Sequence, residues 1–186
     1  MDLKLKNAAV LVTGSSAGLG QSTALAFGTE GARVAVTYHK NRQGAEDTAS
    51  KIREAGGQTL VVHYDLADQD SIRSSIEQIQ QEWGTLNVLV NNAAPMDVAG
   101  PTGQLFEDVP LQNWESMIRQ TLEGVTLTVQ CALPLMRKSG WGRICKCLFR
   151  WNGWLAGIRA LCHGEVWITW FDPYPGSRTG SCQYSE

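Results

Sequence analysis

The amino-acid sequence predicts an α/β protein with a doubly wound parallel sheet, and two observations carry this prediction. Short, nearly all-apolar runs, typical of strands buried on both faces, alternate along residues 1–144 with segments of helical period. The links between them are short, which favours crossovers that place helices on both faces of one sheet. A net charge of −2 and 43% hydrophobic residues argue against a basic nucleic-acid binder and a disordered chain. No apolar run approaches the length of a membrane span.

Each element follows from a local pattern. Five strands are expected, at Ala8–Thr13, Arg33–Tyr38, Thr59–His63, Leu86–Val90 and from Gly142–Ile144 onward. Four helices are expected between them, at Gly20–Thr29, Gly44–Ala55, Asp68–Trp83 and Leu111–Arg137. The third helix shows the pattern best, because Ile72, Ile76 and Ile79 share one helical face. Gly31 follows the first helix and Gly56-Gly57 the second, in the positions that end helices.

The first strand–helix turn carries a glycine motif, Thr13-Gly14-Ser15-Ser16-Ala17-Gly18-Leu19-Gly20. Gly14 permits a tight turn, Gly18 a close approach of a ligand to the backbone, and Gly20 the packing of the helix on the strand. The start of the helix then offers N–H groups and a positive dipole end to a pyrophosphate. Glycine-rich turns also occur for packing alone. The preceding strand and following helix favour a dinucleotide-binding turn of the Rossmann type.

Polar residues also end the third and fourth strands. Asp65 follows the third strand, and Asn91 and Asn92 follow the fourth. Ligands of open α/β sheets bind at this carboxyl edge. The alternatives are a helix cap for Asp65 and hydrogen bonds to turn backbone for the two amides.

In combination, these residues resemble the short-chain dehydrogenase/reductase family of the classical type, and its 3-oxoacyl reductases in particular. The matching segments are Thr13–Gly20, Asp65-Leu66, Asn91-Asn92-Ala93-Ala94, and Trp114 through Gly142-Arg143-Ile144. The resemblance implies an NAD(P)-binding Rossmann domain over residues 1–144 and hydride transfer between a nicotinamide and a small carbonyl or alcohol. It implies cofactor contacts at Gly14, Ser15, Ser16, Gly18, Leu19, Gly20, Tyr38, Asp65, Leu66, Asn92 and Ala93.

The end of the second strand bears on the choice of cofactor. An acid there would bind the ribose 2′-hydroxyl of NAD, but the chain continues from Tyr38 as His39-Lys40-Asn41-Arg42. Lys40 or Arg42 would suit a 2′-phosphate, so NADP is expected, with NAD as the alternative. Either charge could also be an ordinary solvated loop residue.

The catalytic pattern of the family is missing. A Tyr-x-x-x-Lys motif passes the proton in that family, but no tyrosine of this chain has a lysine four residues later. Thr121 stands where the family carries an asparagine, in Thr121-Leu122-Glu123-Gly124, and no serine follows Ile144 at the strand end. No catalytic residue is therefore assigned.

Residues 145–186 differ in character from the rest of the chain. They hold four of the five cysteines and four of the seven tryptophans, and the C-x-C of Cys145 and Cys147 matches neither a zinc motif nor a disulfide framework. When the degenerate codons are read one base later, all four tryptophans become glycine, Leu161 permits Tyr, and Glu165 becomes Lys or Arg. We interpret residues 145–186 as an out-of-frame tail; the alternative is a divergent but genuine tail. We expect it to be poorly organised and to leave the fifth strand exposed.

The functional hypotheses follow from these observations. The first is an NADP-dependent oxidoreductase that is catalytically impaired as written. The alternative is a non-catalytic nucleotide-binding remnant or pseudogene product. A methyltransferase is less favoured, because it would prefer an acid after the second strand. We expect no metal, nucleic-acid or membrane partner. The short polar N-terminus predicts a cytoplasmic setting. Family members are usually homo-oligomers, and for this chain that state is left open.

Overall fold

The chain forms one twisted sheet in a computed structural model that describes residues 4–95, 108–147, 167–171 and 181–182. The order of its strands is β3-β2-β1-β4-β5-β6-β7. Their bounds are β1 Ala9–Val12, β2 Arg33–Tyr38, β3 Gln58–His63, β4 Val88–Asn91, β5 Gly142–Lys146, β6 Trp167–Phe171 and β7 Ser181–Cys182.

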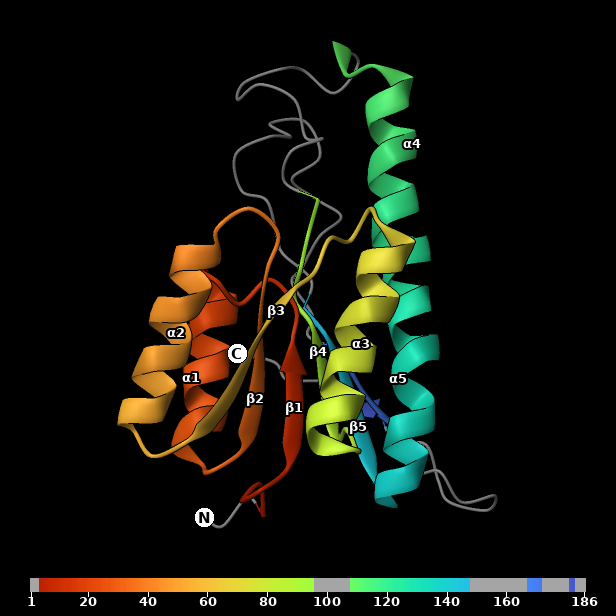
Figure 1. Cartoon of the computed structure of the whole chain (residues 1–186). Coiled ribbons are helices and arrows are strands. Elements are labelled where there is room, and N and C mark those ends of the chain that lie inside the picture. Colours follow the sequence, from red (N-terminus) through yellow and green to blue (C-terminus); the bar gives the residue numbers. More distant parts are fainter. Residues whose placement is uncertain (1–3, 96–107, 148–166, 172–180, 183–186) are drawn as a thin grey trace.

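The first five strands are parallel, as predicted, and β1 lies in the interior of the sheet (Figure 1). Leu11 pairs with Ala35 of β2 on one side and with Leu89 of β4 on the other. The strand order reverses direction at β1, because β2 and β3 lie to one side and β4 and β5 to the other. Such a switch point is where open α/β sheets bind ligands, beyond the carboxyl ends of the strands.

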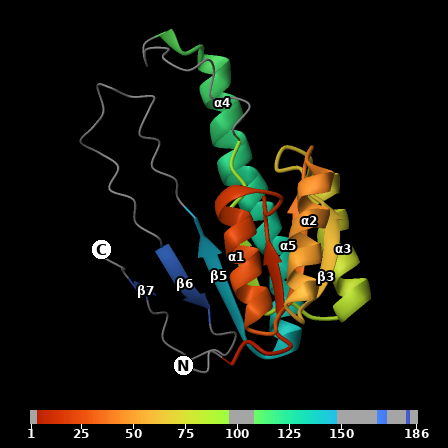
Figure 2. The same ribbon diagram turned by 90° about the vertical axis from the view of Figure 1, so that its left-hand side faces the viewer.

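Helices cover both faces of the sheet (Figures 1 and 2). Their bounds are α1 Gly18–Thr29, α2 Arg42–Glu54, α3 Gln69–Trp83, α4 Leu111–Arg119 and α5 Val125–Ser139. Alternate strand residues point to opposite faces, so Val10 and Val12 pack with α1 and α2, whereas Ala9 and Leu11 pack with α3 and α5. Burial on both faces explains why the strands are almost wholly apolar.

The expected continuous helix over Leu111–Arg137 is divided in the structure. A π-helical turn, η3 at Gln120–Gly124, separates α4 from α5. Gly124 is buried there, and a Cβ at this position would overlap the carbonyl oxygen of Leu66. The helical pattern of the sequence does not reveal this, because the cause is a neighbour distant in sequence.

The expectation of an exposed fifth strand was wrong. β6 pairs antiparallel with the whole of β5, from Gly142–Phe171 to Lys146–Trp167, and β7 pairs antiparallel with β6. An edge strand offers unpaired N–H and C=O groups, which any extended segment nearby can satisfy. The rest of the tail lies outside the described residues, so its organisation stays a prediction. Within the described part of the chain, no helix has both the length and the hydropathy needed to cross a membrane.

Candidate functional site

The β1–α1 turn requires glycine for three different reasons. Gly14 and Gly18 have positive φ angles of 66° and 56°, which side chains other than glycine rarely adopt. A Cβ at Gly14 would also lie 3.0 Å from the Ala93 Cα, whereas one at Gly18 would meet no atom within 4 Å. A Cβ at Gly20 would overlap the Gly14 carbonyl oxygen. Gly18 is therefore the glycine of this turn that leaves space beside the backbone.

Buried hydroxyl groups hold the turn from the side of β2. Thr37 Oγ1 accepts a hydrogen bond from the Gly14 N–H at 2.8 Å. Ser15 Oγ donates to the Val12 carbonyl and accepts from the Thr37 N–H, both at 2.8 Å. The predicted contact residue Ser15 thus faces the protein interior with its hydroxyl engaged. Thr37 was missed from the sequence, although a hydroxyl near the end of a buried apolar strand is a signal for such a role.

The Asn92 side chain fastens the turn to β4. Its Nδ2 donates to the carbonyl oxygens of Thr13 at 2.9 Å and Gly14 at 3.0 Å. Thr13 Oγ1 accepts from the backbone N–H groups of both Asn92 and Ala93 at 3.0 Å. Asn92 is buried, so the structure gives it the backbone-holding role that the sequence left as an alternative. Thr13 belongs to the same support.

The neighbouring Asn91 is different. Its side chain is buried, and neither Oδ1 nor Nδ2 has a hydrogen-bond partner among the described residues. A buried amide without partners is costly in free energy. It lies at the carboxyl end of β4, beside the site.

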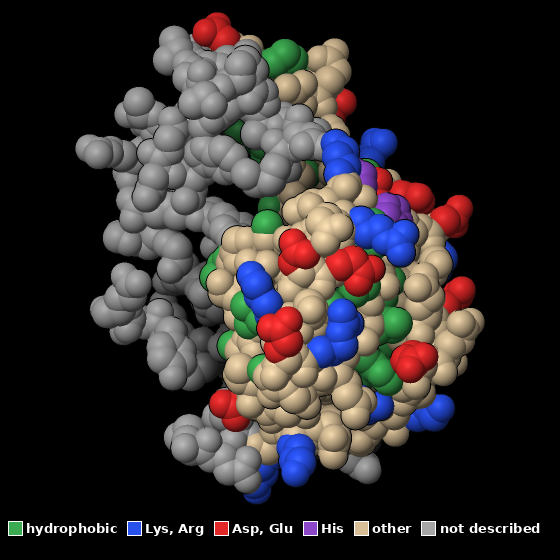
Figure 3. Space-filling view, turned by 60° about the vertical axis from the view of Figure 1, so that its left-hand side comes forward, with side chains coloured by type: hydrophobic (Ala, Val, Ile, Leu, Met, Phe, Trp, Pro, Cys, Tyr) green, Lys and Arg blue, Asp and Glu red, His purple; other side chains and the backbone are tan. Residues whose placement is uncertain are grey.

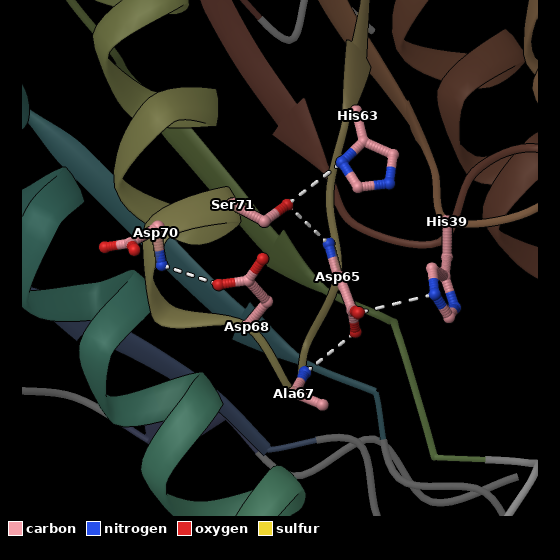
Figure 4. A network of polar contacts seen from close by, with 7 residues as sticks. All are labelled: His39, His63, Asp65, Ala67, Asp68, Asp70 and Ser71. Carbon is pink, nitrogen blue, oxygen red and sulfur yellow. Dashed lines mark hydrogen bonds and ion pairs between the residues drawn. The ribbon is translucent and has the colours of Figure 1, made fainter.

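Asp65 and His39 meet across the ends of β3 and β2 (Figure 4). His39 Nε2 lies 3.3 Å from Asp65 Oδ2, while Asp65 Oδ1 accepts from the Ala67 N–H at 2.9 Å. The cap of α3 is Asp68, whose Oδ1 accepts from the Asp70 N–H. The alternative role of Asp65 as a helix cap therefore belongs to its neighbour Asp68. Asp65 keeps a partly exposed carboxylate at the sheet edge.

The other predicted contact residues differ in how far their side chains are exposed to solvent. Leu66 is buried in a cluster with Tyr64 and Ile72, so its side chain belongs to the core. Tyr38 is half-buried, with its ring edge against His63 at a centroid distance of 5.4 Å. The side chain of Leu19 is 55% exposed at the start of α1. Ser16 and Ala93 are partly exposed.

The start of α1 suits an anion. Its N-cap residue, Ala17, makes no side-chain hydrogen bond to the first turn, and that turn contains no acid. Neither a capping side chain nor an acid of the first turn therefore neutralises these N–H groups and the positive end of the helix dipole. Together with the open space beside Gly18, these features fit the pyrophosphate of a dinucleotide.

Basic residues follow β2 next to this turn. Asn41 Nδ2 lies 3.5 Å from the Ser16 carbonyl oxygen, which links the start of α2 to the glycine turn. Arg42, the first residue of α2, is exposed and lies 3.8 Å from Glu46 in an exposed ion pair. Figure 3 shows the histidine side chains of this face with basic and acidic side chains beside them. The segment after β2 therefore carries cationic side chains next to the glycine turn.

The end of β5 carries thiols in place of a serine. Cys145 and Cys147 both pack against the core cluster under α1 and α2. The thiol of Cys145 donates a hydrogen bond to the Cys147 sulfur. This bond, together with the smaller effect of the nearby Lys146 charge, lowers the pKa of Cys147 to about 7. Burial lowers the pKa of Lys146. The two tyrosines of the described residues lie elsewhere, because Tyr38 packs on His63 and Tyr64 is buried against Thr128.

Comparison with known proteins matches this geometry to one family. A sequence model of the short chain dehydrogenase family matches residues 8–147. The 3-oxoacyl-[acyl-carrier-protein] reductase FabG of Staphylococcus aureus (strain Mu50) is 35% identical over 135 residues, which are 72% of this chain and 52% of the reductase. The chain spans about half the length of the curated relatives that it matches.

Solved structures show the same likeness. A 7α-hydroxysteroid dehydrogenase in complex with NADH and 7-oxo glycochenodeoxycholic acid has a TM-score of 0.69 at 26% identity, covering 77% of this chain and 53% of the dehydrogenase. A short chain dehydrogenase of Burkholderia cenocepacia in complex with NADP has a TM-score of 0.67 at 28% identity, covering 76% and 55%. The central parallel sheet, the glycine turn and the matched residues 8–147 agree, and the chain belongs to the short chain dehydrogenase family.

Proposed function

We propose that this chain binds a nicotinamide dinucleotide at the β1–α1 turn and is, by descent, an oxidoreductase acting on small carbonyl compounds. The observation that carries the proposal is the turn itself. It is held on both sides by the Thr37 and Asn92 hydrogen bonds, with open space beside Gly18 and no side-chain cap on α1. The nicotinamide supplies hydride chemistry when bound. The residues of this chain bind and orient the dinucleotide.

The proposed contacts are those at the surface of the edge. They are Gly14, Ser16, Gly18, Leu19, Tyr38, Asp65 and Ala93, whereas Ser15, Gly20, Leu66 and Asn92 support the site from within. NADP is proposed over NAD because His39, Lys40 and Arg42 follow β2 where an NAD enzyme would place an acid. The NADH and NADP found in the related structures support a nicotinamide cofactor in either form.

We propose further that this chain is impaired in turnover. The 186 residues contain no Tyr-x-x-x-Lys, and β5 ends with Cys145 and Lys146, followed by Cys147, with no serine at this place. A division into a cofactor domain over residues 1–144 and an out-of-frame tail over 145–186 explains both. The absence of Tyr-x-x-x-Lys also favours a second candidate, a nucleotide-binding remnant without catalysis. FabG acts on 3-oxoacyl groups by name, so a 3-oxoacyl thioester is the first carbonyl substrate to test. A cytoplasmic setting stays a prediction.

Cofactor binding is tested with two variants at Gly18 that differ only in the charge of the introduced side chain. Asn and Asp have the same shape and are the non-glycine residues that best tolerate a positive φ. In a Gly18→Asn variant we expect weakened binding of NADPH. In Gly18→Asp we expect a further loss of roughly tenfold or more, because the added negative charge meets the pyrophosphate. Titration of NADPH fluorescence measures both. Equal affinities for the two variants, or no binding by the unaltered chain, would contradict the proposed site.

A further inference from the structure

Two thiols lie side by side at the carboxyl end of β5. Cys145 and Cys147 are separated by one residue, so their side chains point to the same face of the sheet. Both pack against the core cluster on the side of α1 and α2, whereas Ile144, the residue before them, packs on the other side. Both are free and half-buried. The Cys145 thiol donates a hydrogen bond to the Cys147 sulfur, which brings the two sulfur atoms into contact.

The other cysteines of the described residues are not placed to compete for this pair. Cys131 belongs to α5 and packs against the core cluster on the opposite face of the sheet. Cys182 of β7 and Cys145 of β5 both pair with Ile168, so β6 lies between them. Neighbouring strands are about 4.8 Å apart, so two of these spacings exceed the Cα separation of about 7 Å that a disulfide can span. Among the described cysteines, Cys147 is therefore the one within reach of Cys145.

The two thiols differ in how readily they lose a proton. The hydrogen bond from Cys145, with a smaller effect of the Lys146 charge, lowers the pKa of Cys147 to about 7, although burial opposes this change. The same bond, burial and the Cys147 charge raise the pKa of Cys145. The thiolate is the form of cysteine that attacks a disulfide. Cys147 is therefore the attacking thiol at neutral pH, and Cys145 ionises more easily once Cys147 has reacted and lost its charge.

We propose that Cys145 and Cys147 form a redox-active dithiol, which low-molecular-weight disulfides oxidise by thiol–disulfide exchange. In the first step the Cys147 sulfur attacks one sulfur of the reagent, whose S–S bond breaks, and the other half of the reagent leaves and takes up a proton. In the second step Cys145 loses its proton and attacks the Cys147 sulfur, which expels the remaining half of the reagent as a thiol. Two protein thiols are thus oxidised to one disulfide, and one reagent disulfide is reduced to two thiols. This chemistry depends on where the thiols lie, whatever the origin of residues 145–186.

The geometry of β5 makes this disulfide easy to reduce. Two residues of an extended strand span about 6.6–6.8 Å, which is the upper end of the Cα separations found in disulfides. Closing the bond therefore strains the end of β5, where the Cys147 N–H donates to the Asn91 carbonyl oxygen at 3.0 Å. Strained disulfides are reduced more readily than relaxed ones. We expect a reducing thiol to reopen the pair, so the modification is reversible.

The test follows the two thiols in the full chain after incubation with oxidised glutathione at about pH 7. Free thiols are then blocked by alkylation, and the chain is digested with trypsin. Trypsin cleaves after Arg143, Lys146 and Arg150, so it places the two cysteines in the separate peptides 144–146 and 147–150. We expect mass spectrometry to find these peptides joined after oxidation, and separate when the oxidised chain is first treated with reduced glutathione.

Three variants separate the roles of the two thiols. In Cys145→Ser the hydroxyl can still donate a hydrogen bond but cannot form a disulfide, so the mixed disulfide of Cys147 with glutathione should accumulate. Cys145→Ala also removes the donor. Cys147 should then react roughly fivefold more slowly at about pH 7, because its thiolate fraction falls by more than its nucleophilicity rises. Cys131→Ser is the matched control and should leave both the joined peptides and the rate unchanged.

Several outcomes would overturn the proposal. One is that peptides 144–146 and 147–150 are never joined, or are joined instead to peptides that contain Cys162 or Cys182. Another is that Cys147 reacts no faster than Cys131 in the folded chain. Urea removes the strand geometry, so we expect Cys147 to lose its advantage there, and an equal advantage in folded and unfolded chain would also overturn the proposal. Because all these measurements follow thiols alone, failure of cofactor binding leaves them unaffected.

Discussion

Tyr64 shows how neighbouring residues determine the position and the pKa of a single side chain beside the site. It follows β3 directly, and its buried hydroxyl lies 2.7 Å from Thr128 Oγ1 of α5. Thr128 Oγ1 also donates to the Gly124 carbonyl at 2.8 Å. The hydroxyl pair therefore joins the end of β3 to α5. Burial, with a smaller effect of the Asp65 charge, raises the pKa of Tyr64 to about 12 despite the bond to Thr128.

The raised pKa predicts a loss of stability in alkali. The unfolded chain releases the Tyr64 proton at its ordinary pKa of 10.0 and the folded chain at about 12, so the contribution is present below pH 10 and disappears as pH rises to 12. Its size is of the order of 2–3 kcal/mol. Tyr64→Phe should be less stable by about 1 kcal/mol at pH 8, since one buried hydrogen bond is lost. Urea unfolding at several pH values measures both proteins. A gap that does not shrink above pH 10 would contradict the prediction.

At the scale of elements, the turn η3 joins α4 to α5 and packs Gly124 against Leu66. A Cβ at Gly124 would overlap the Leu66 carbonyl oxygen and come within 3.0 Å of Leu66 Cδ1. Leu66 adjoins Asp65, so this contact also determines how closely the helix approaches the edge where the cofactor is proposed to bind. The glycine of Thr121-Leu122-Glu123-Gly124 is needed for packing, whatever the role of Thr121.

We expect Gly124→Ala to destabilise the chain by about 1–3 kcal/mol, because overpacking outweighs the better helix propensity of alanine. Glu123→Ala is the matched control, since Glu123 is exposed and its ion pair with Arg119, at 3.8 Å, is worth little. Thermal and urea unfolding measure both. If Gly124→Ala were more stable than the unaltered chain, as propensity alone predicts, the packing of η3 on Leu66 would not be as described.

For the whole molecule, we expect cofactor binding without turnover. The described residues bring the proposed cofactor contacts together at the carboxyl ends of β1, β2, β3 and β4, whereas the 186 residues contain no Tyr-x-x-x-Lys. A general acid contributes typically about 10²–10⁴-fold to rate. The chain should therefore bind a dinucleotide without reducing carbonyls.

We expect no NADPH oxidation by the 186-residue chain with a 3-oxoacyl thioester or a small panel of ketones. A chain read one base later from codon 145, with Tyr at 161 and Lys at 165, should turn over and bind the cofactor more tightly. The absorbance of NADPH at its nicotinamide band, followed over time for both proteins under the same conditions, measures the turnover of each. Turnover by the unaltered chain that is abolished in Gly18→Asp would reveal a different proton donor. Inactivity of the corrected chain would contradict the out-of-frame interpretation.

The sequence alone determined the order of the elements from β1 to β5, apart from the η3 turn, and indicated the carboxyl edge as the candidate site. Apolar runs such as Ala8–Thr13 and the spacing of Ile72, Ile76 and Ile79 are local patterns, and their periods correspond to strand and helix. The need for glycine in the first turn could also be predicted from the sequence, because few other residue types adopt positive φ angles.

Only the tertiary structure decided what the polar side chains do. Asn92 and Ser15 hold the backbone instead of facing outward, Asp65 pairs with His39, and Gly124 meets Leu66. Each of these roles depends on an atom far away in sequence, such as the Gly14 carbonyl 78 residues from Asn92. The pairing of β5 with β6 was hidden for the same reason, because a backbone edge accepts a partner strand whatever its side chains. A one-dimensional pattern records the period of an element, and only the packed fold supplies its partners.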